Sequence, residues 1–359
     1  MNTPDSVLAL VRPDILALTP YSSARKESSG GRVWLDANEN PNTPSADSPL
    51  LNRYPEPQPA ALVTQLAALY SVAPSSVLIT RGSDEGIDLL LRAFCRAERD
   101  SILITPPTYG MYAVAAAIQG ARVATVPLLR EKNFALDPAA ILAAFTPAVK
   151  LVFLCSPNNP TGQLLDRDAT LSIVRALAGR AVVVVDEAYI EFADARSVAS
   201  ELAANPNLVV LRTLSKAYGL AGARVGATLA VPELIGVLQK IIAPYPVPTP
   251  VAQAALAALT PAGLAAARDS IDGLVSEHRR LAAALPSLPC IRRVWPGDAN
   301  FLLVEVSDVA RVMSAARAVG VILRDRSKDV PNAIRITVGT PAENYLVLTV
   351  LAQCTPAAV

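Results

Sequence analysis

Histidine and lysine are scarce in this sequence of 359 residues. It contains one histidine, His278, and six lysines against 26 arginines. His278 lies in "SEHRRLAAAL", which is typical of a solvated helix face, so a Ser-His-Asp or Cys-His mechanism has almost no candidate base. The same count excludes a histidine-rich metal site, and we expect no metal in this protein.

Cysteine pairs, net charge and glycine motifs are lacking as well. The four cysteines are far apart and form no C-x-x-C, so a disulfide framework or zinc site is not expected and a reducing compartment fits better. The formal net charge of +1 gives no electrostatic reason to expect nucleic acid or acidic lipid as a partner. Neither G-x-G-x-x-G nor G-x-x-x-x-G-K-[ST] occurs, which disfavours a dehydrogenase or a P-loop kinase.

Long uninterrupted apolar runs are missing too. The N-terminus has Asp5, Arg12 and Asp14 where a signal peptide needs an apolar run. Residues 241–267 carry no charge, but five prolines interrupt them, and backbone that faces lipid must satisfy its own hydrogen bonds. We therefore expect no membrane span and a cytoplasmic location.

From residue 61 onward, short apolar, β-branched runs alternate with segments of helical period. Helices are expected at 61–72, 84–97, 109–120 and 166–179. Strands are expected at 76–80, 101–105, 121–128, 149–155, 180–189, 207–214 and 226–232. This order predicts an α/β fold with a mostly parallel central sheet covered by helices, which binds its ligand at the carboxyl ends of the strands.

The prolines between 244 and 250 indicate a joint in the chain. Beyond them come a helix-rich stretch at 251–284, strands at 291–295, 300–306, 321–325 and 333–339, a helix at 308–320 and a last helix. We expect an N-terminal arm at 1–44, a large domain at 45–246 and a smaller α+β domain at 247–359.

Polar residues that can carry chemistry follow several of these strands. Asp186 ends a buried strand, where a carboxylate is costly unless it is paired, and Tyr189 follows three residues later. After the strand at 76–80, Ser83 and Asp84 open a helix whose free N–H groups can hold an anion. Asn159 follows the strand at 149–155. Each of these features, taken alone, is also typical of an ordinary helix cap or turn.

Lys216 stands in "RTLSKAYGLAGARVG", a stretch too apolar and glycine-rich for an ordinary solvated surface. Arg224 lies eight positions further on, and Thr213 and Ser215 supply hydroxyls nearby. Arginine and hydroxyl groups beside a helix N-terminus could offset the burial of a phosphate. A desolvated lysine beside a second cation has a lowered pKa and becomes a nucleophilic amine.

Together these groups describe one ligand, an aromatic cation that carries a phenolic oxygen, a phosphate and an aldehyde. That ligand is pyridoxal 5′-phosphate (PLP), which proteins hold by a lysine Schiff base and a carboxylate at the ring nitrogen. The order along the chain is more specific than any single residue: Tyr109, Asn159, Asp186, Tyr189, Lys216 and Arg224.

The sequence resembles the fold-type I PLP aminotransferases of class I and II, and more closely the histidinol-phosphate aminotransferases. The strings "LDANENP", "NRYPEPQP", "PPTYGMY", "CSPNNPTGQL", "VVDEAYIEF" and "RTLSKAYGLAGARVG" carry the resemblance, which extends from Tyr21 to Gly339. It implies that the homologous enzymes' reaction takes place here: histidinol phosphate and 2-oxoglutarate give imidazole-acetol phosphate and glutamate, in histidine biosynthesis.

The resemblance also implies roles for the residues around the cofactor ring. Lys216 bonds to the cofactor aldehyde and then moves the proton between the substrate carbon and the cofactor carbon. Asp186 keeps the ring nitrogen protonated. Asn159 and Tyr189 hold the phenolic oxygen, and Tyr109 stacks on the ring face.

Further residues are implied at the cofactor phosphate and at the substrate. The N–H groups of Ser83 and Asp84, with Ser215 and Arg224, hold the phosphate. Tyr54 reaches it from the neighbouring subunit, which implies a homodimer with shared active sites. At the substrate the resemblance implies four residues: Tyr21, Asn38, Arg324 and Arg335. Residues 41–50 depart from the family, which usually has an aromatic and a small residue after "NENP".

Related functions use the same frame. An aromatic or broad-range aminotransferase would share the cofactor residues, and a threonine-phosphate decarboxylase would also have the lysine, aspartate, arginine and phosphate site. A PLP-binding regulator would need a DNA-binding domain, for which we find no basic helix. Fold alone does not decide between these enzymes.

Overall fold

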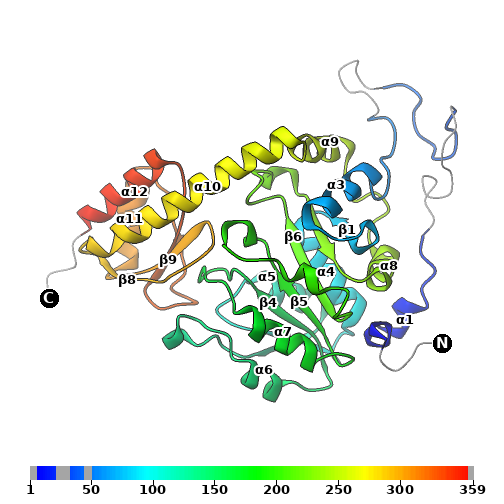
Figure 1. Cartoon of the computed structure of the whole chain (residues 1–359), viewed down its shortest axis with the longest axis horizontal. Coiled ribbons are helices and arrows are strands. Elements are labelled where there is room, and N and C mark those ends of the chain that lie inside the picture. The colour runs from blue at the N-terminus through cyan, green and yellow to red at the C-terminus, as the bar shows by residue number, and fades with distance from the viewer. Residues whose placement is uncertain (1–5, 22–32, 44–50, 355–359) are drawn as a thin grey trace.

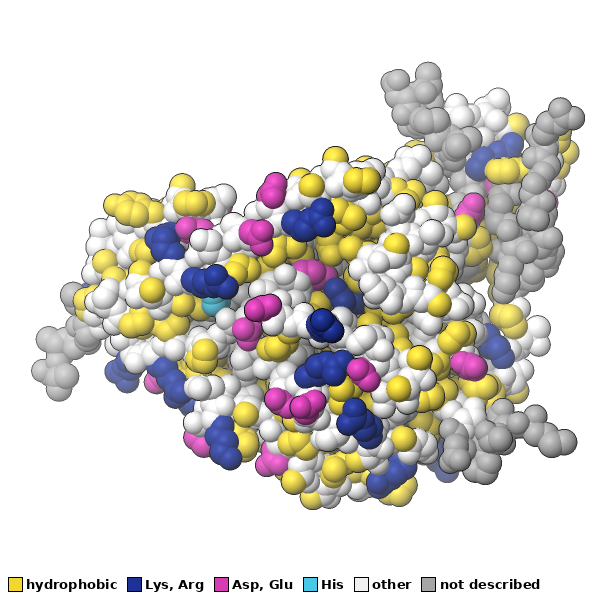
Figure 2. All heavy atoms as spheres, in the orientation of Figure 1, with side chains coloured by type: hydrophobic (Ala, Val, Ile, Leu, Met, Phe, Trp, Pro, Cys, Tyr) yellow, Lys and Arg dark blue, Asp and Glu magenta, His cyan; other side chains and the backbone are white. Residues whose placement is uncertain are grey.

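The computed structural model of the chain describes residues 6–21, 33–43 and 51–354. Figure 1 shows two sheets, each with its own helices, and a long helix that runs from one to the other. On the face drawn in Figure 2, basic and acidic side chains are interspersed rather than gathered by sign.

The larger sheet has seven strands in the order β1-β7-β6-β5-β4-β2-β3. The five strands from β3 to β6 run parallel, whereas β7 is antiparallel to both of its neighbours. The mostly parallel sheet predicted from the sequence is thus confirmed. The strands are β1 (Val77–Thr80), β2 (Ser101–Ile104), β3 (Arg122–Thr125), β4 (Val149–Cys155), β5 (Val182–Asp186), β6 (Leu208–Thr213) and β7 (Gly226–Leu229).

Helices cover both faces of this sheet, and the central strands are buried on both sides. Along β5, Val183 and Val185 join one hydrophobic cluster, while Val182 and Val184 join the other. This explains why β5 reads as an unbroken apolar run. One face carries α3 (Ala60–Tyr70), α6 (Pro138–Ala144) and α7 (Arg167–Ala176), and the other α4 (Gly82–Phe94), α5 (Met111–Gln119) and α8 (Pro232–Ile241). Helices α6 and α8 are not among the predicted elements.

The smaller sheet is antiparallel, in the order β10-β11-β9-β8. Its strands are β8 (Ile291–Val294), β9 (Phe301–Val306), β10 (Arg324–Asp325) and β11 (Ala333–Thr337). Side chains from the end of α10 (Pro261–Ala284), from α11 (Val309–Ala318) and from α12 (Pro341–Gln353) pack in one cluster against it. The strand expected at 321–325 is reduced to the two residues of β10.

Helix α10 links the two parts of the molecule. The shorter α9 (Thr249–Ala258), which precedes it, packs on α3 through Ala252 and Ala255. In its middle, α10 lies against β9 and the turn after β5. For this reason His278 is half-buried and its pKa is lowered by burial, so the expectation of a solvated histidine is wrong.

The first described segment of the expected arm contacts the large sheet's helices. It holds a short 3₁₀ helix (Val7–Leu10) and α1 (Pro13–Leu16), and the buried Val7 and Val11 join the cluster around α8. Lys240 of α8 donates to the Leu16 carbonyl at 2.7 Å. The boundaries near residues 44 and 246 stay a prediction. Other 3₁₀ helices are Pro74–Ser76, Arg130–Lys132, Ile190–Phe192, Val198–Glu201, Ala221–Ala223 and Leu285–Ser287.

A helix must be both long and apolar to cross a membrane, and this applies to the helices of the described segments. None of them alone combines the length and the apolar character needed to cross one. The segments Thr249–Ala258 and Pro261–Ser287 meet those criteria only as a pair, which is bent by 71°.

Candidate active site

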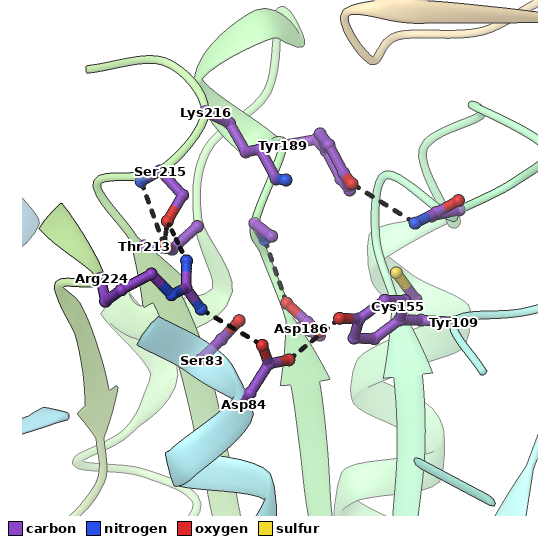
Figure 3. Close-up of a pocket in the computed structure, with 12 residues that line it drawn as sticks. Ser83, Asp84, Tyr109, Cys155, Asp186, Tyr189, Thr213, Ser215, Lys216 and Arg224 are labelled. Carbon is purple, nitrogen blue, oxygen red and sulfur yellow. Dashed lines mark hydrogen bonds and ion pairs between the residues drawn. The ribbon is translucent and has the colours of Figure 1, made fainter. Parts of the chain in front are cut away.

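A cavity of about 430 Å³ opens where β4, β5 and β6 end and α4 begins. It brings together nine of the ten residues predicted to contact the cofactor, all except Tyr54. Figure 3 shows their side chains converging from separate elements. The lining residues are Ser83, Asp84, Tyr109, Cys155, Asn159, Asp186, Ala188, Tyr189, Thr213, Ser215, Lys216 and Arg224.

Asp186 forms the floor of the cavity, as the last residue of β5. Only 2% of its surface is exposed. Its Oδ2 accepts a hydrogen bond from the Tyr112 hydroxyl at 2.8 Å, and its Oδ1 accepts one from the Ala188 N–H at 3.2 Å. Burial raises the pKa of the Asp186 carboxyl to about 6, although these two hydrogen bonds favour the ionised form. A cation bound above Asp186 would relieve that cost.

An anion cradle lies beside this floor, between α4 and the segment that follows β6. The Arg224 guanidinium donates to Ser215 Oγ at 3.2 Å and to Asp84 Oδ2 at 3.3 Å. It approaches Gly82 so closely that a Cβ there would lie 2.6 Å from Arg224 Nη2. The helix N-terminus of α4 and this guanidinium together suit a phosphate group.

The anion cradle also depends on a close backbone approach. A Cβ on Gly226, at the start of β7, would lie 2.7 Å from the Ser83 nitrogen and 2.5 Å from the Gly82 carbonyl carbon. Glycine at 226 therefore allows β7 to pass next to the first turn of α4.

Lys216 follows β6 and points into the same space as Asp186 (Figure 3). Partial burial lowers its pKa, and the positive charges of Arg335 and Arg224 lower it further. Its Nζ lies 5.7 Å from the centre of the Tyr189 ring. The lysine is thus held as an amine that can lose its proton more easily than an ordinary surface lysine.

Asn159 and Tyr189 form the opposite wall. The Asn159 Nδ2 donates to the Tyr189 hydroxyl at 3.3 Å. Arg335, on β11 of the smaller sheet, donates from Nη1 to Asn159 Oδ1, and its guanidinium lies 5.0 Å from the centre of the Phe301 ring. Arg335 thereby brings a cation from the smaller sheet to the edge of the cavity.

The other predicted substrate residues lie outside this cavity. Arg324 is exposed on β10, directly opposite Arg335 in the antiparallel pair. Tyr21 is 72% exposed. Asn38 and Tyr54 line a separate surface cavity of about 710 Å³, where the Tyr54 ring stacks on Tyr245 at 4.5 Å. Of the segment 41–50, residues 44–50 lie outside the described residues.

Two features of the site are absent from the sequence-based prediction. One is Tyr112, the hydrogen-bond partner of Asp186. The other is a buried ion cluster behind the cavity, in which Arg212 contacts Glu187 at 3.3 Å and Glu191 at 2.8 Å. The only sequence signal for them was a second tyrosine in "PPTYGMY" and an arginine inside an apolar strand.

The described residues also hold no group of three or more histidine, cysteine, aspartate or glutamate side chains that could bind a metal ion.

Comparison with known proteins agrees with this geometry. Residues 27–351 match the family described as aminotransferase class I and II. The histidinol-phosphate aminotransferase of Stenotrophomonas maltophilia is 50% identical over 355 residues, which are 97% of each chain. Histidinol-phosphate aminotransferase 1 of Pasteurella multocida is 47% identical, over 96% of this chain and 98% of that one. The chain belongs to the histidinol-phosphate aminotransferases of class I and II.

A solved structure of the same family supports the fold. The crystal structure of histidinol-phosphate aminotransferase from Sinorhizobium meliloti in complex with pyridoxal 5′-phosphate superposes with a TM-score of 0.76. The two sequences are 26% identical, and the match covers 84% of this chain and 82% of that one.

The residues of the cavity fit PLP, the cofactor of class I and II aminotransferases. Asp186 offers a buried anion for the ring nitrogen, and Lys216 offers an amine for the aldehyde. The Arg224 and Ser215 side chains offer donors for the phosphate. Burial raises the pKa of Asp186, and both of its hydrogen-bond donors, the Tyr112 hydroxyl and the Ala188 N–H, are neutral. A protonated pyridine ring would supply the positive charge that these donors lack.

Proposed function

We propose that this protein transfers the amino group of L-histidinol phosphate to 2-oxoglutarate. The products are imidazole-acetol phosphate and glutamate, and the reaction is a step of histidine biosynthesis. One observation carries the proposal: the Asp186 carboxylate, at the end of β5, and the Lys216 amine, which follows the neighbouring strand β6, face the same cavity beside an anion cradle. The identity of 50% to a histidinol-phosphate aminotransferase over nearly the whole chain supports the choice of substrate.

The side chains around the ring would divide the chemistry among them. When bound, PLP supplies an electron-poor ring that takes up the electron pair left on the substrate carbon. Asp186 holds the proton at the ring nitrogen. The Tyr189 hydroxyl and the Asn159 amide hold the phenolic oxygen. Lys216 Nζ, whose pKa is lowered by burial, takes the proton from the substrate carbon and returns it to the cofactor carbon.

Arg335 and Arg324 would bind the acidic groups of both substrates. Histidinol phosphate carries a phosphate and no carboxylate, whereas 2-oxoglutarate carries two carboxylates. A planar guanidinium suits either group, because it can donate two parallel hydrogen bonds to a pair of oxygens. Arg324 and Arg335 are direct partners on the neighbouring strands β10 and β11, and Arg335 reaches Asn159 at the edge of the cavity. We propose that this arginine pair serves both half-reactions.

A homodimer with shared active sites is part of the proposal. Tyr54 is half-exposed and lies outside the cavity of its own chain. Val33 and Leu35, from the segment before it, are 76% and 88% exposed. Exposed apolar side chains such as these favour burial against a second copy. We place Tyr54 at the cofactor phosphate of that second copy. Tyr21 and Asn38 are proposed to lie near the substrate.

A cytoplasmic location is also proposed. All four cysteines are free and buried, which suits a reducing compartment.

The visible absorption spectrum tests the proposed reaction. PLP-loaded protein should show a visible band, and adding histidinol phosphate without any keto acid should remove it by converting the cofactor to its amine form. 2-Oxoglutarate should then restore the band. A band that ignores histidinol phosphate but responds to phenylalanine or to threonine phosphate would replace the substrate and keep the cofactor.

Lys216→Ala is the matched variant for this experiment. It should keep the fold, as judged by circular dichroism, and lose turnover because no other amine among the residues that line the cavity can move the proton. Near-normal turnover in Lys216→Ala would contradict the mechanism.

Hybrid dimers test the shared site. Tyr54→Ala and Lys216→Ala chains should each have low activity, and mixing them should restore activity if Tyr54 serves the neighbouring chain. In that hybrid one site carries both substitutions and the other carries neither. If Tyr54 serves its own chain, every site in the hybrid keeps one defect and activity stays low.

A further inference from the structure

Tyr112 lies beneath the floor of the cavity, on the first turns of α5. Its side chain is fully buried, with 0% exposure. Its hydroxyl donates to Asp186 Oδ2 at 2.8 Å, the shorter of the two hydrogen bonds that this carboxylate accepts. Neither the aspartate nor the tyrosine can turn away from this contact into solvent.

Aromatic packing fixes the position of the Tyr112 ring. The ring stacks on Phe153 of β4 at 4.7 Å with an angle of 16° between the planes. It also meets Tyr109 edge-on, at 5.6 Å and 85°. Phe153, on which Tyr112 stacks, therefore lies on the strand that pairs with the strand of Asp186, since β4 pairs with β5. The hydroxyl is therefore aimed by its surroundings rather than by the hydrogen bond alone.

We propose that Tyr112 is a positioning residue, which orients the Asp186 carboxylate toward the ring nitrogen of the cofactor and keeps that carboxylate ionised. The inference rests on the proposed function, because it needs a ring nitrogen above Asp186. With Oδ2 engaged by Tyr112 and Oδ1 engaged by the Ala188 N–H, the carboxylate has one orientation in the cavity.

The charges around Asp186 explain why such a donor is needed. Burial raises the pKa of this carboxyl, and the negative charges of Asp84 and Glu187 raise it further. The hydrogen bond from Tyr112 lowers it. Lys216 is the cation that faces Asp186. The other titratable groups that face it are Tyr109, Tyr189 and Cys155.

Tyr112→Phe removes the hydroxyl and keeps the ring. Tyr70→Phe is the matched control, because Tyr70 is also a buried tyrosine of the larger domain but its hydroxyl has no hydrogen-bond partner. Both variants should fold, which circular dichroism and thermal unfolding would establish. The readouts are the PLP dissociation constant, the pH titration of the visible band, and kcat and KM.

Tyr112→Phe should weaken PLP binding and lower kcat by roughly tenfold each, the effect of one hydrogen bond to a charged group. The KM for histidinol phosphate should change little, because Tyr112 does not face the arginines. If a smaller fraction of Asp186 is ionised, the ring nitrogen of the cofactor is protonated less often. The ring then withdraws less electron density from Lys216 Nζ, which binds its proton more tightly. The midpoint of the visible titration should therefore rise by roughly half a pH unit or more, and Tyr70→Phe should leave it unchanged.

The outcomes separate this inference from the proposed function. If wild-type protein forms no visible band with PLP, the proposed function fails. If the wild type forms the band and Tyr112→Phe titrates and binds PLP as the wild type does, the positioning role is wrong and the function stands. Equal shifts in Tyr112→Phe and Tyr70→Phe would also overturn it, because a general loosening of the core would then explain both.

Discussion

Arg324 and Arg335 are direct partners across the antiparallel pair β10–β11. Side chains of directly opposite residues project from the same face of a sheet, so these two arginines share one face. Burial lowers the pKa of Arg335, and the positive charges of Arg326 and Arg324 lower it further. An anion bound between Arg324 and Arg335 would be attracted by both and would offset the repulsion between them.

We expect Arg335→Ala to lower kcat/KM in both half-reactions, by roughly 100-fold, because it removes a charge-assisted bidentate contact. Arg324→Ala should have a smaller effect in the same direction without lowering Tm, because it removes a repulsion. Single-turnover kinetics with histidinol phosphate and with 2-oxoglutarate would measure the two half-reactions separately. Arg292→Ala, an exposed arginine of β8 in the same sheet, is the control. A loss in only one half-reaction would show that the two acidic groups are held separately.

The pH dependence of stability should report the burial of Asp186. Its pKa is about 6 in the folded protein and about 3.9 in an unfolded chain. Between these values the folded state binds more protons, so the free energy of unfolding that Asp186 contributes falls as the pH rises. The cost is absent below about pH 4 and complete above about pH 6, where it reaches about 3 kcal/mol.

Asp186→Asn removes this titration. In PLP-free protein, the stability of Asp186→Asn relative to the wild type should rise by about 2 kcal/mol between pH 4.5 and pH 7. Urea unfolding at a series of pH values would measure the difference, which cancels any effect of the amide that does not depend on pH. Parallel curves for the two proteins would show that the carboxyl has an ordinary pKa.

Most of the fold and much of the site were predictable from the sequence, for a physical reason. Strands that are buried on both faces read as continuous apolar runs, so polar residues such as Asp186 and Asn159 stand out where the runs end.

Contacts between distant segments leave no such signal in the sequence. Tyr112 and Asp186 are 74 residues apart, and Arg335 and Asn159 are 176 apart. The antiparallel direction of β7 depends on pairing that local composition does not encode. The place proposed for Tyr54 would depend on a second chain, whose position a single sequence does not encode.

Gly226→Ala should disrupt the anion cradle. The added Cβ would meet the Ser83 nitrogen at 2.7 Å and backbone atoms on both sides, and these cannot move as a flexible side chain could. We expect a loss of roughly 1–3 kcal/mol in the free energy of unfolding and weaker binding of PLP.

Gly236→Ala is the control, because Gly236 is exposed in α8 and a Cβ there meets nothing within 4 Å. It should stabilise the protein by about 0.5–1 kcal/mol. Equal PLP affinity in Gly226→Ala and the wild type would contradict the role given to this close approach.

The ion cluster behind the cavity connects β6, which precedes Lys216, with the segment that follows Asp186. Arg212 lies on β6 and is paired with Glu187 and Glu191, and its guanidinium packs 4.4 Å from the centre of the Tyr70 ring. All three charged side chains are almost completely buried. Removing the arginine leaves two carboxylates without their cation in a site with little exposure to solvent.

Arg212→Ala should therefore lower the free energy of unfolding by about 3–5 kcal/mol, the range found when one partner of a buried ion pair is removed. Arg167→Ala is the control, because its ion pair with Glu201 is partly exposed and should contribute no more than about 1 kcal/mol. Urea unfolding of both variants would measure the contrast. Replacing Arg212, Glu187 and Glu191 together by apolar residues should recover part of the loss, since no buried charge then remains unpaired. A small effect of Arg212→Ala, similar to that of Arg167→Ala, would show that water enters the cluster and solvates the glutamates.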